Sequence, residues 1–114
     1  MKRHKYGAKR TTCAQGHSHP SKREALRCWQ LHALAQAGEI TELVVEPTFT
    51  FTPGGVPITM QNGRLAQYRP DFTYIEKGKR VAEDVKGAEV TEAFRLRSAL
   101  FRACFPEYEL RITK

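Results

Sequence analysis

Residues 68–87 constrain the fold most, because they combine two segments rich in β-branched and aromatic side chains with a short turn between them. Residues 72–75 and residues 81–85 each favour a strand. Lys77-Gly78-Lys79 lies between them and predicts a turn. We therefore expect a β-hairpin over this stretch.

The open end of this hairpin is expected to gather charged side chains. Residues two apart on a strand share a face, so Asp84 and Lys86 point the same way, with the small Ala82 beside them. Asp71 enters the first strand directly after Pro70, and the start of one antiparallel strand lies near the end of the next. Asp71 is therefore expected to approach Asp84 and Lys86. The opposite face of the second strand is expected to carry Val81, Glu83 and Val85.

Two carboxylates and one lysine at one end of a sheet suit phosphodiester hydrolysis. Mg²⁺ is held by one or two carboxylates together with water and phosphate oxygens, so Asp71 and Asp84 suffice as its protein ligands. The ion would activate a water, and Lys86 could orient that water or stabilise charge on the phosphoryl oxygens. The alternative is a solvated hairpin whose Asp and Lys side chains form weak surface pairs. Spacing alone leaves both interpretations open.

The spacing of the hairpin carboxylates resembles the signature of the PD-(D/E)xK nuclease superfamily, which has the restriction-endonuclease-like fold. Pro70-Asp71 is followed by twelve residues and then by Asp84-Val85-Lys86. Five stretches are similar, in order, to a small phage and prophage family of that superfamily: residues 21–25, 37–40, 46–49, 71–72 and 83–87. The resemblance covers roughly residues 6 to 112. It implies an α/β fold with an α-β-β-β-α-β core, in which helices flank a central mixed sheet. It also implies a Mg²⁺ or Mn²⁺ site and endonuclease activity on DNA.

The resemblance assigns catalytic roles to Asp71, Asp84, Lys86 and Glu24, with Glu24 as a third metal-site carboxylate on the first helix. The residues themselves offer another function for Glu24. Ser21-Lys22-Arg23-Glu24 is a capping box, in which Ser21 caps the helix and Glu24 folds back to the Ser21 amide. Glu46 departs from the glutamine expected there in the family and is either near the metal site or at a solvated sheet edge.

Composition agrees with a nucleic-acid partner. The chain has 114 residues, enough for one domain, and 19 Lys and Arg against 12 Asp and Glu give a net charge of +7. A basic arm is expected over about residues 1–12. The residues assigned to DNA contact are Lys2, Arg3, Lys5, Lys9, Arg10, Lys22, Arg69, Arg95 and Arg97. For the arginines of the second helix, a solvated basic face is the alternative.

Two classes of function remain open on this basis. One is the metal-dependent endonuclease, with branched DNA such as a Holliday junction as the first expected substrate and phage DNA processing as the other. The second is a non-catalytic basic DNA-binding module, whose binding would survive loss of the hairpin carboxylates. A homodimer would suit symmetric cleavage of two strands. No apolar run reaches the roughly 18 residues of a membrane span and no signal-peptide core is present, so we expect a cytoplasmic location in a bacterial or phage-infected cell.

The remaining helices and strands are predicted from the spacing of apolar residues along the chain and from the glycine and proline residues that interrupt it. Residues 21–37 favour a helix ended by Gly38, with Ala25, Cys28 and Trp29 on its apolar face and Leu26, Leu31 and Leu34 widening that face. Residues 91–104 favour a second helix that ends before Pro106. Its expected core face carries Phe94, Ala99, Leu100, Ala103 and Cys104, with Leu96 and Phe101 beside that face. Strands are expected over residues 40–52 and 108–113, and a hairpin with a two-residue type I′ turn at Asn62-Gly63 over residues 56–68.

Cys13, His17, His19 and Cys28 supply enough ligands for zinc. Their spacing matches no known zinc finger, and no C-x-x-C pair is present. The favoured interpretation is a short loop whose histidines face solvent or DNA phosphate. With an odd third thiol at Cys104 and no framework spacing, disulfides are not expected.

Overall fold

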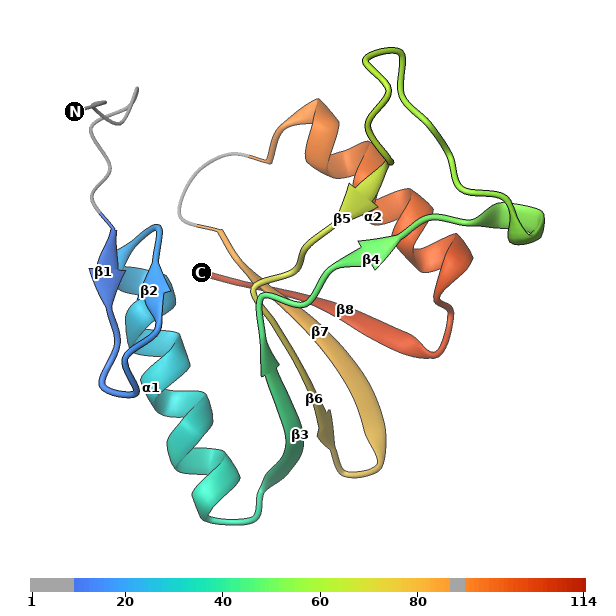
Figure 1. The fold of residues 1–114 in the computed structure, drawn as a ribbon. Helices are drawn as coiled ribbons and strands as arrows, with labels where there is room; N and C mark the ends of the chain where they lie inside the picture. Colours follow the sequence, from blue (N-terminus) through green and yellow to red (C-terminus); the bar gives the residue numbers. More distant parts are fainter. Residues whose placement is uncertain (1–9, 87–89) are drawn as a thin grey trace.

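The computed structural model describes residues 10–86 and 90–114, and its centre is a four-stranded sheet in the order β3-β6-β7-β8 (Figure 1). The strands are β3 (Ile40–Val45), β6 (Phe72–Glu76), β7 (Lys79–Val85) and β8 (Tyr108–Thr113). β3, β6 and β7 pair antiparallel, whereas β8 runs parallel to β7. The sheet is therefore mixed, and the parallel pair is joined through a helix, as such a crossover requires.

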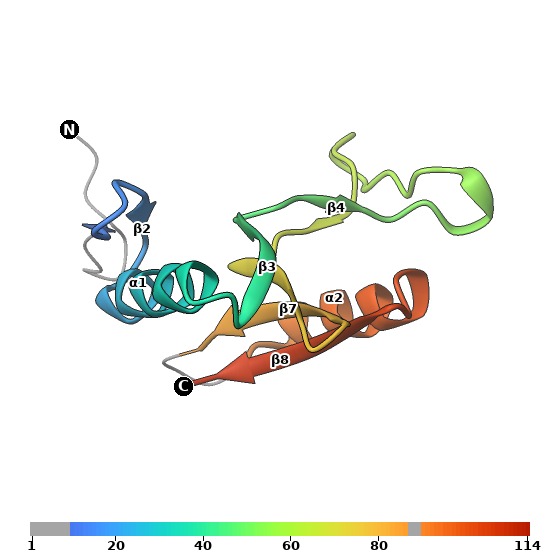
Figure 2. The same cartoon turned by 90° about the horizontal axis from the view of Figure 1, so that it is seen from below.

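Two helices, α1 (Lys22–Gln36) and α2 (Glu92–Cys104), cover opposite faces of this sheet (Figure 2). Val81 packs in one buried cluster with Leu31 of α1, and Ala82 packs in another with Phe101 of α2. Consecutive strand residues point to opposite faces, so the two clusters lie on the two sides of β7. The expectation of a mixed α/β fold with two helices is confirmed.

The predicted hairpin is formed by β6 and β7, with Phe72 opposite Glu83. Its turn has two residues, Lys77 and Gly78, both at positive φ (51° and 78°), as a type I′ turn requires. Lys79, expected in the turn, is the first residue of β7. The assignment of Asp84 and Glu83 to opposite faces is confirmed below by their partners.

The first helix has the predicted bounds, but part of its predicted apolar face is exposed. Leu26 is 57% exposed and Trp29 is 51% exposed, whereas Cys28 and Leu31 are fully buried. Successive helical residues are about 100° apart, and the buried stripe passes through residues 24, 25, 28 and 31, to one side of Trp29. The contacts with the sheet, which periodicity does not reveal, select this narrower stripe.

The expected continuous strand over residues 40–52 is wrong. β3 ends at Val45, and Phe49–Thr50 forms β4, which pairs with β5 (Gln67–Tyr68) in a separate two-stranded sheet. The chain turns at Glu46, which has a φ of 53°, and Pro47 follows with no amide hydrogen to continue the ladder.

The expected two-residue turn at Asn62-Gly63 is also wrong. A type I′ turn needs positive φ at both residues, and only Gly63, at 85°, has it. Instead Met60 and Arg64 pair around a three-residue loop, with the Met60 amide donating to the Arg64 carbonyl at 2.7 Å. The flanking strands are reduced to one bridge between Thr59 and Leu65, and this segment extends alongside α2 (Figure 1).

The second helix has the predicted bounds, with Thr91 as its cap and Cys104 as its last residue. Its predicted core face is only partly correct, because Ala99 and Ala103 are exposed, while Ser98 is buried. Of the two residues expected beside that face, Phe101 is fully buried and Leu96 is 63% exposed. β8 matches the last predicted strand. Within the described parts of the chain, neither helix has the length and apolar character needed to cross a membrane.

The chain ahead of α1 forms a short hairpin that the sequence did not predict. Its strands are β1 (Thr11–Thr12) and β2 (Ser18–His19), which pair with Thr11 opposite His19. The hairpin packs against α1 (Figure 1).

Candidate active site

Four of the residues predicted to be catalytic line one cleft of about 470 Å³: Glu24, Asp71, Asp84 and Lys86. Glu24 comes from the first turn of α1, Asp71 from the residue before β6, and Asp84 and Lys86 from the end of β7. Separate elements therefore bring three carboxylates and one ammonium group to the same end of the sheet.

Asp71 is fixed by the start of the hairpin. The preceding Pro70 is buried, and Asp71 Oδ2 accepts a hydrogen bond from the Val85 amide at 2.6 Å. Burial raises the pKa of Asp71 to about 9, the Val85 amide opposes that shift, and the nearby Asp84 and Glu24 carboxylates add to it. Without a cation in the cleft, these carboxylates disfavour one another's charge.

Asp84 is 4% exposed and contacts the side chains of Tyr68 and Lys86. The Tyr68 hydroxyl donates a hydrogen bond to Asp84 Oδ2, and Lys86 Nζ lies 3.4 Å from Asp84 Oδ1. Burial, and then the hydrogen bond to Asp84, raise the pKa of Tyr68, so the hydroxyl remains a neutral donor. Sequence reasoning missed Tyr68 because its partner is 16 residues away on a different sheet.

Lys86 is held between two groups. In addition to Asp84, its Nζ lies 4.2 Å from the centre of the Phe94 ring, which comes from α2. A cation over an aromatic face is attracted to the ring's negative charge density. The ammonium group is thus positioned in the cleft by both β7 and α2.

Glu24 fulfils half of the predicted capping box. The Glu24 amide donates to Ser21 Oγ at 3.2 Å, so Ser21 caps α1 as expected. The Glu24 carboxylate lines the cleft instead. Its Oε2 is buried, lies 3.4 Å from His19 Nδ1 and has no hydrogen-bond partner in residues 10–86 and 90–114. Burial raises the pKa of Glu24, and the nearby Asp71 and His19 side chains oppose that shift. The Glu24 side chain therefore contributes to the cleft, whereas its backbone amide contributes to the helix cap.

The structure places the basic residues predicted to contact DNA in different surroundings. Arg69 and Arg97 line the cleft. Arg10 instead donates to the Ser18 side chain and carbonyl at 2.9 and 2.8 Å, and Arg95 pairs with Glu92 at 3.5 Å. Lys22 is exposed on the first turn of α1. The remaining predicted contacts, Lys2, Arg3, Lys5 and Lys9, lie outside the described residues.

On the other face of β7, a buried ion pair joins the sheet to α1. Glu83 is fully buried and accepts from Arg27 Nε at 2.6 Å and from an Arg27 terminal nitrogen at 2.9 Å. Tyr74 and Thr113 also donate to its carboxylate. Burial would raise the pKa of Glu83, but these hydrogen bonds together lower it below its usual value. This network fixes the strand that carries Asp84.

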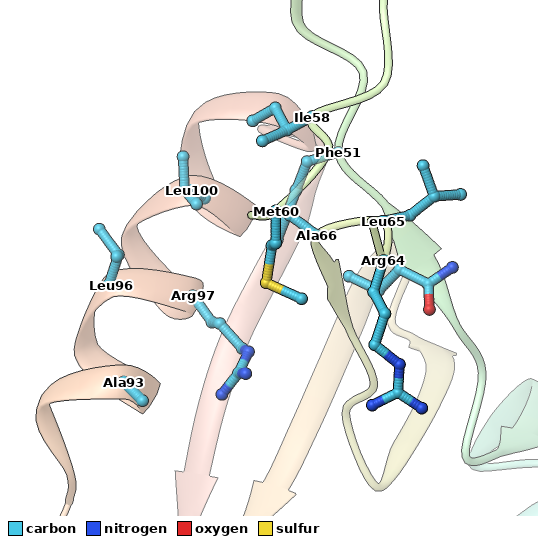
Figure 3. A pocket seen from close by; sticks show the side chains of 11 residues that line it. Phe51, Ile58, Met60, Arg64, Leu65, Ala66, Ala93, Leu96, Arg97 and Leu100 are labelled. Carbon is cyan, nitrogen blue, oxygen red and sulfur yellow. The ribbon is translucent and has the colours of Figure 1, made fainter. Parts of the chain in front are cut away.

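A larger pocket of about 760 Å³ adjoins the cleft and is mainly apolar (Figure 3). It lies between α2 and residues 51–67, and its walls include Phe51, Ile58, Met60, Leu96 and Leu100. Its described lining residues include two charged ones, Arg64 and Arg97, and no carboxylate, histidine or cysteine. Of these two hollows, the smaller cleft therefore holds the groups able to do acid-base or metal chemistry.

The expectation that His17 and His19 face solvent is wrong for His19, which is fully buried, and His17 is half-buried. Both approach Cys13 and Cys28, which are also buried, on the side of α1 that carries Glu24. The sequence names these four side chains as possible zinc ligands, but their spacing does not show that Cys28 joins the others from the second turn of α1.

A sequence-family model described as "Protein of unknown function (DUF1064)" matches residues 3–114. The chain belongs to this family. No curated protein and no solved structure matches the chain. The DUF1064 description states no function, so what the cleft can do rests on its own geometry and chemistry.

Proposed function

We propose that this protein is a divalent-metal-dependent DNA endonuclease of the PD-(D/E)xK type, with the restriction-endonuclease-like core. The observation that carries the proposal is the meeting of Glu24, Asp71 and Asp84 with Lys86 in a single cleft. The element order α1-β3-β6-β7-α2-β8 supports the fold assignment, since it has the α-β-β-β-α-β order of that core.

The residues fit a hard divalent cation. The cleft offers carboxylate oxygens from three residues, which are the ligands that Mg²⁺ and Mn²⁺ prefer. Within the described part of the chain, Glu24 Oε2 is buried without a hydrogen-bond partner, and the pKa of Asp71 is raised to about 9 by burial and by its acidic neighbours. A cation held by Asp71, Asp84 and Glu24 would favour the ionised form of all three.

When bound, the metal would lower the pKa of a water and neutralise charge on the phosphoryl oxygens. The side chains supply the remaining functions. Tyr68 holds Asp84 in place, and Lys86 orients the attacking water or stabilises the developing negative charge. Arg69 and Arg97 are positioned to bind the phosphates that flank the scissile bond.

The proposed substrate is DNA, as the net charge of +7 favours a polyanion. A four-way junction is the first substrate to test, by analogy with Holliday-junction resolvases of this fold class, and phage DNA processing is the other proposed setting. The proposed location is the cytoplasm of a bacterial or phage-infected cell, and a homodimer would place two clefts on two strands.

The test is cleavage of linear, nicked, flapped and four-way-junction DNA in the presence of Mg²⁺, of Mn²⁺ or of chelator, with binding measured in parallel. We expect cleavage of at least one substrate that requires the metal. Salt-sensitive binding with no cleavage of any substrate under either metal would contradict the proposal and favour a non-catalytic DNA-binding module.

Replacing Lys86 with methionine is expected to lower the cleavage rate by about a hundredfold, because methionine keeps the packing on Phe94 but removes the charge that acts in the transition state. Initial rates on the best substrate at saturating DNA measure this effect. The control is Lys79→Met, an exposed position at the opposite end of β7, which should retain the wild-type rate. Equal rates for wild type and Lys86→Met would remove Lys86 from the mechanism.

The two functions combined in the Ser21-x-x-Glu24 motif should separate by mutation. Ser21→Ala removes the cap and is expected to cost about 1 kcal/mol of stability while cleavage continues. Glu24→Gln keeps the backbone amide of residue 24 that donates to Ser21 Oγ. This variant is expected to reduce cleavage strongly with little loss of stability. Denaturant unfolding and cleavage rates measured on both variants test this. A Glu24→Gln variant that cleaves normally would return Glu24 to a purely structural role.

A further inference from the structure

The strongest unassigned cluster lies between the β1-β2 hairpin and α1. One ligand atom from each of Cys13, His17, His19 and Cys28 lies within 4.8 Å of all the others. Cys13 Sγ and Cys28 Sγ are 3.4 Å apart, and His17 Nδ1 lies 3.5 Å and 3.4 Å from these two sulfurs. Zinc in a tetrahedral Cys₂His₂ site, with Zn–S about 2.3 Å and Zn–N about 2.0–2.1 Å, places its ligand atoms about 3.4–3.8 Å apart. The three distances are close to the edges of such a tetrahedron.

The burial of His19 is the second observation. This ring is fully buried, and neither of its nitrogens has a hydrogen-bond partner among the residues that the structure describes. A buried polar group left without a partner costs free energy, and native structures seldom retain one without a reason. His19 Nδ1 faces Glu24 Oε2 at 3.4 Å, which leaves Nε2 as the nitrogen available to a metal. A metal bond at Nε2 would satisfy the group that the protein itself leaves unpaired.

We propose that Cys13, His17, His19 and Cys28 bind one structural zinc ion that fastens the β1-β2 hairpin to α1. Two thiolates neutralise the charge of Zn²⁺, so the complex can be buried without a net charge. The four protein ligands complete a tetrahedron, as in structural sites, and leave no open position for a substrate.

The surroundings of the cluster fit this assignment. The Cys13 amide donates to the His17 carbonyl at 2.8 Å, and the Gly16 amide donates to the Cys13 carbonyl at 2.9 Å, so backbone bonds close the turn that presents Cys13 and His17. His32 is adjacent, but its Nδ1 donates to the Cys28 carbonyl at 2.8 Å and so carries a proton rather than a free lone pair. Two-residue strands provide little stability of their own, which gives the hairpin a need for such a link.

The zinc site would also position a residue of the cleft. A zinc-bound histidine commonly donates its other N–H to a carboxylate, which orients the ring. Here the facing carboxylate is Glu24, one of the acidic residues of the candidate active site. The zinc site stands on its own four ligands and does not depend on nuclease activity.

The experiment measures metal content and thiol state in tag-free protein purified without chelator. We expect about one zinc per chain by elemental analysis, and three free thiols after denaturation. Replacing zinc with Co²⁺ should give the visible absorption bands of a tetrahedral thiolate site. Removing the metal should lower the unfolding temperature by at least about 10 °C.

Variants identify the ligands. Cys28→Ser and His19→Asn should lose the zinc, whereas Cys104→Ser, His32→Asn and Asp84→Asn should retain it. If the buried variants fail to fold, His17→Gln, at a half-buried position, and the Co²⁺ spectrum of the wild type still test the assignment.

Folded wild-type protein with three free thiols and no bound metal would overturn the proposal. So would a disulfide between Cys13 and Cys28, detected as a single free thiol, or a stoichiometric metal other than zinc. Because every readout is metal content, spectrum or stability, a failure here is distinguishable from a failure to cleave DNA.

Discussion

Replacing Asp84 with asparagine is expected to reduce DNA cleavage by about a thousandfold while DNA binding is retained, since a catalytic metal contributes several kcal/mol of transition-state stabilisation. Asparagine has the shape of aspartate and still offers an oxygen to the Tyr68 hydroxyl, so the cleft should keep its geometry. The substitution removes one negative charge from the groups that would bind the metal. Cleavage rates with saturating Mg²⁺, together with DNA affinity at fixed salt, measure the two effects separately.

A second readout of this variant does not require knowledge of the substrate. A ligand that binds only the folded state raises the unfolding temperature, so millimolar Mg²⁺ should stabilise the wild type and have little effect on Asp84→Asn. Glu107→Gln is the matched control, because Glu107 is exposed in the turn just before β8, away from the cleft. This variant should keep both cleavage and the response to Mg²⁺. Cleavage by Asp84→Asn at the wild-type rate would refute the metal-dependent mechanism.

The hairpin that carries the candidate site could be predicted because its information is local. Side chains alternate between the two faces along β7, which predicted that Asp84 and Glu83 point to opposite sides. In the structure Asp84 accepts from Tyr68 on one side, and Glu83 accepts from Arg27 on the other. The antiparallel pairing then placed Asp71 beside the end of β7. These relationships follow from a period of two and from the pairing of neighbouring strands.

The features that were missed depend on contacts between distant segments. Glu46 has a positive φ that its residue type does not favour, and its amide donates to the Asp71 carbonyl at 2.8 Å. A tertiary hydrogen bond thus accompanies the bend that separates β3 from β4. The burial of His19 and the approach of Cys28 to Cys13 likewise depend on how the β1-β2 hairpin packs on α1. Spacing along the chain contains none of this information.

The largest stability effect is expected at the buried ion pair on the opposite face of β7. Arg27→Met keeps most of the aliphatic packing of Arg27 but leaves the Glu83 carboxylate buried without its cation. Removing one partner of a buried pair typically costs about 3–5 kcal/mol, which for a chain of this size corresponds to about 10–20 °C in unfolding temperature. Denaturant and thermal unfolding measure it. Arg23→Met, an exposed position one turn earlier, should change stability by less than about 0.5 kcal/mol.

A second substitution separates the charge effect from lost packing. Glu83→Gln should destabilise the wild type, because it weakens the hydrogen bonds from Arg27. In the Arg27→Met background the same change should recover stability, since it removes the uncompensated charge while a side-chain oxygen remains for Tyr74 and Thr113. Opposite signs in the two backgrounds would establish electrostatic coupling between Arg27 and Glu83. Equal losses in both would instead mean that Arg27 stabilises the fold through packing, and that β7 is held in place by the sheet and the two apolar clusters.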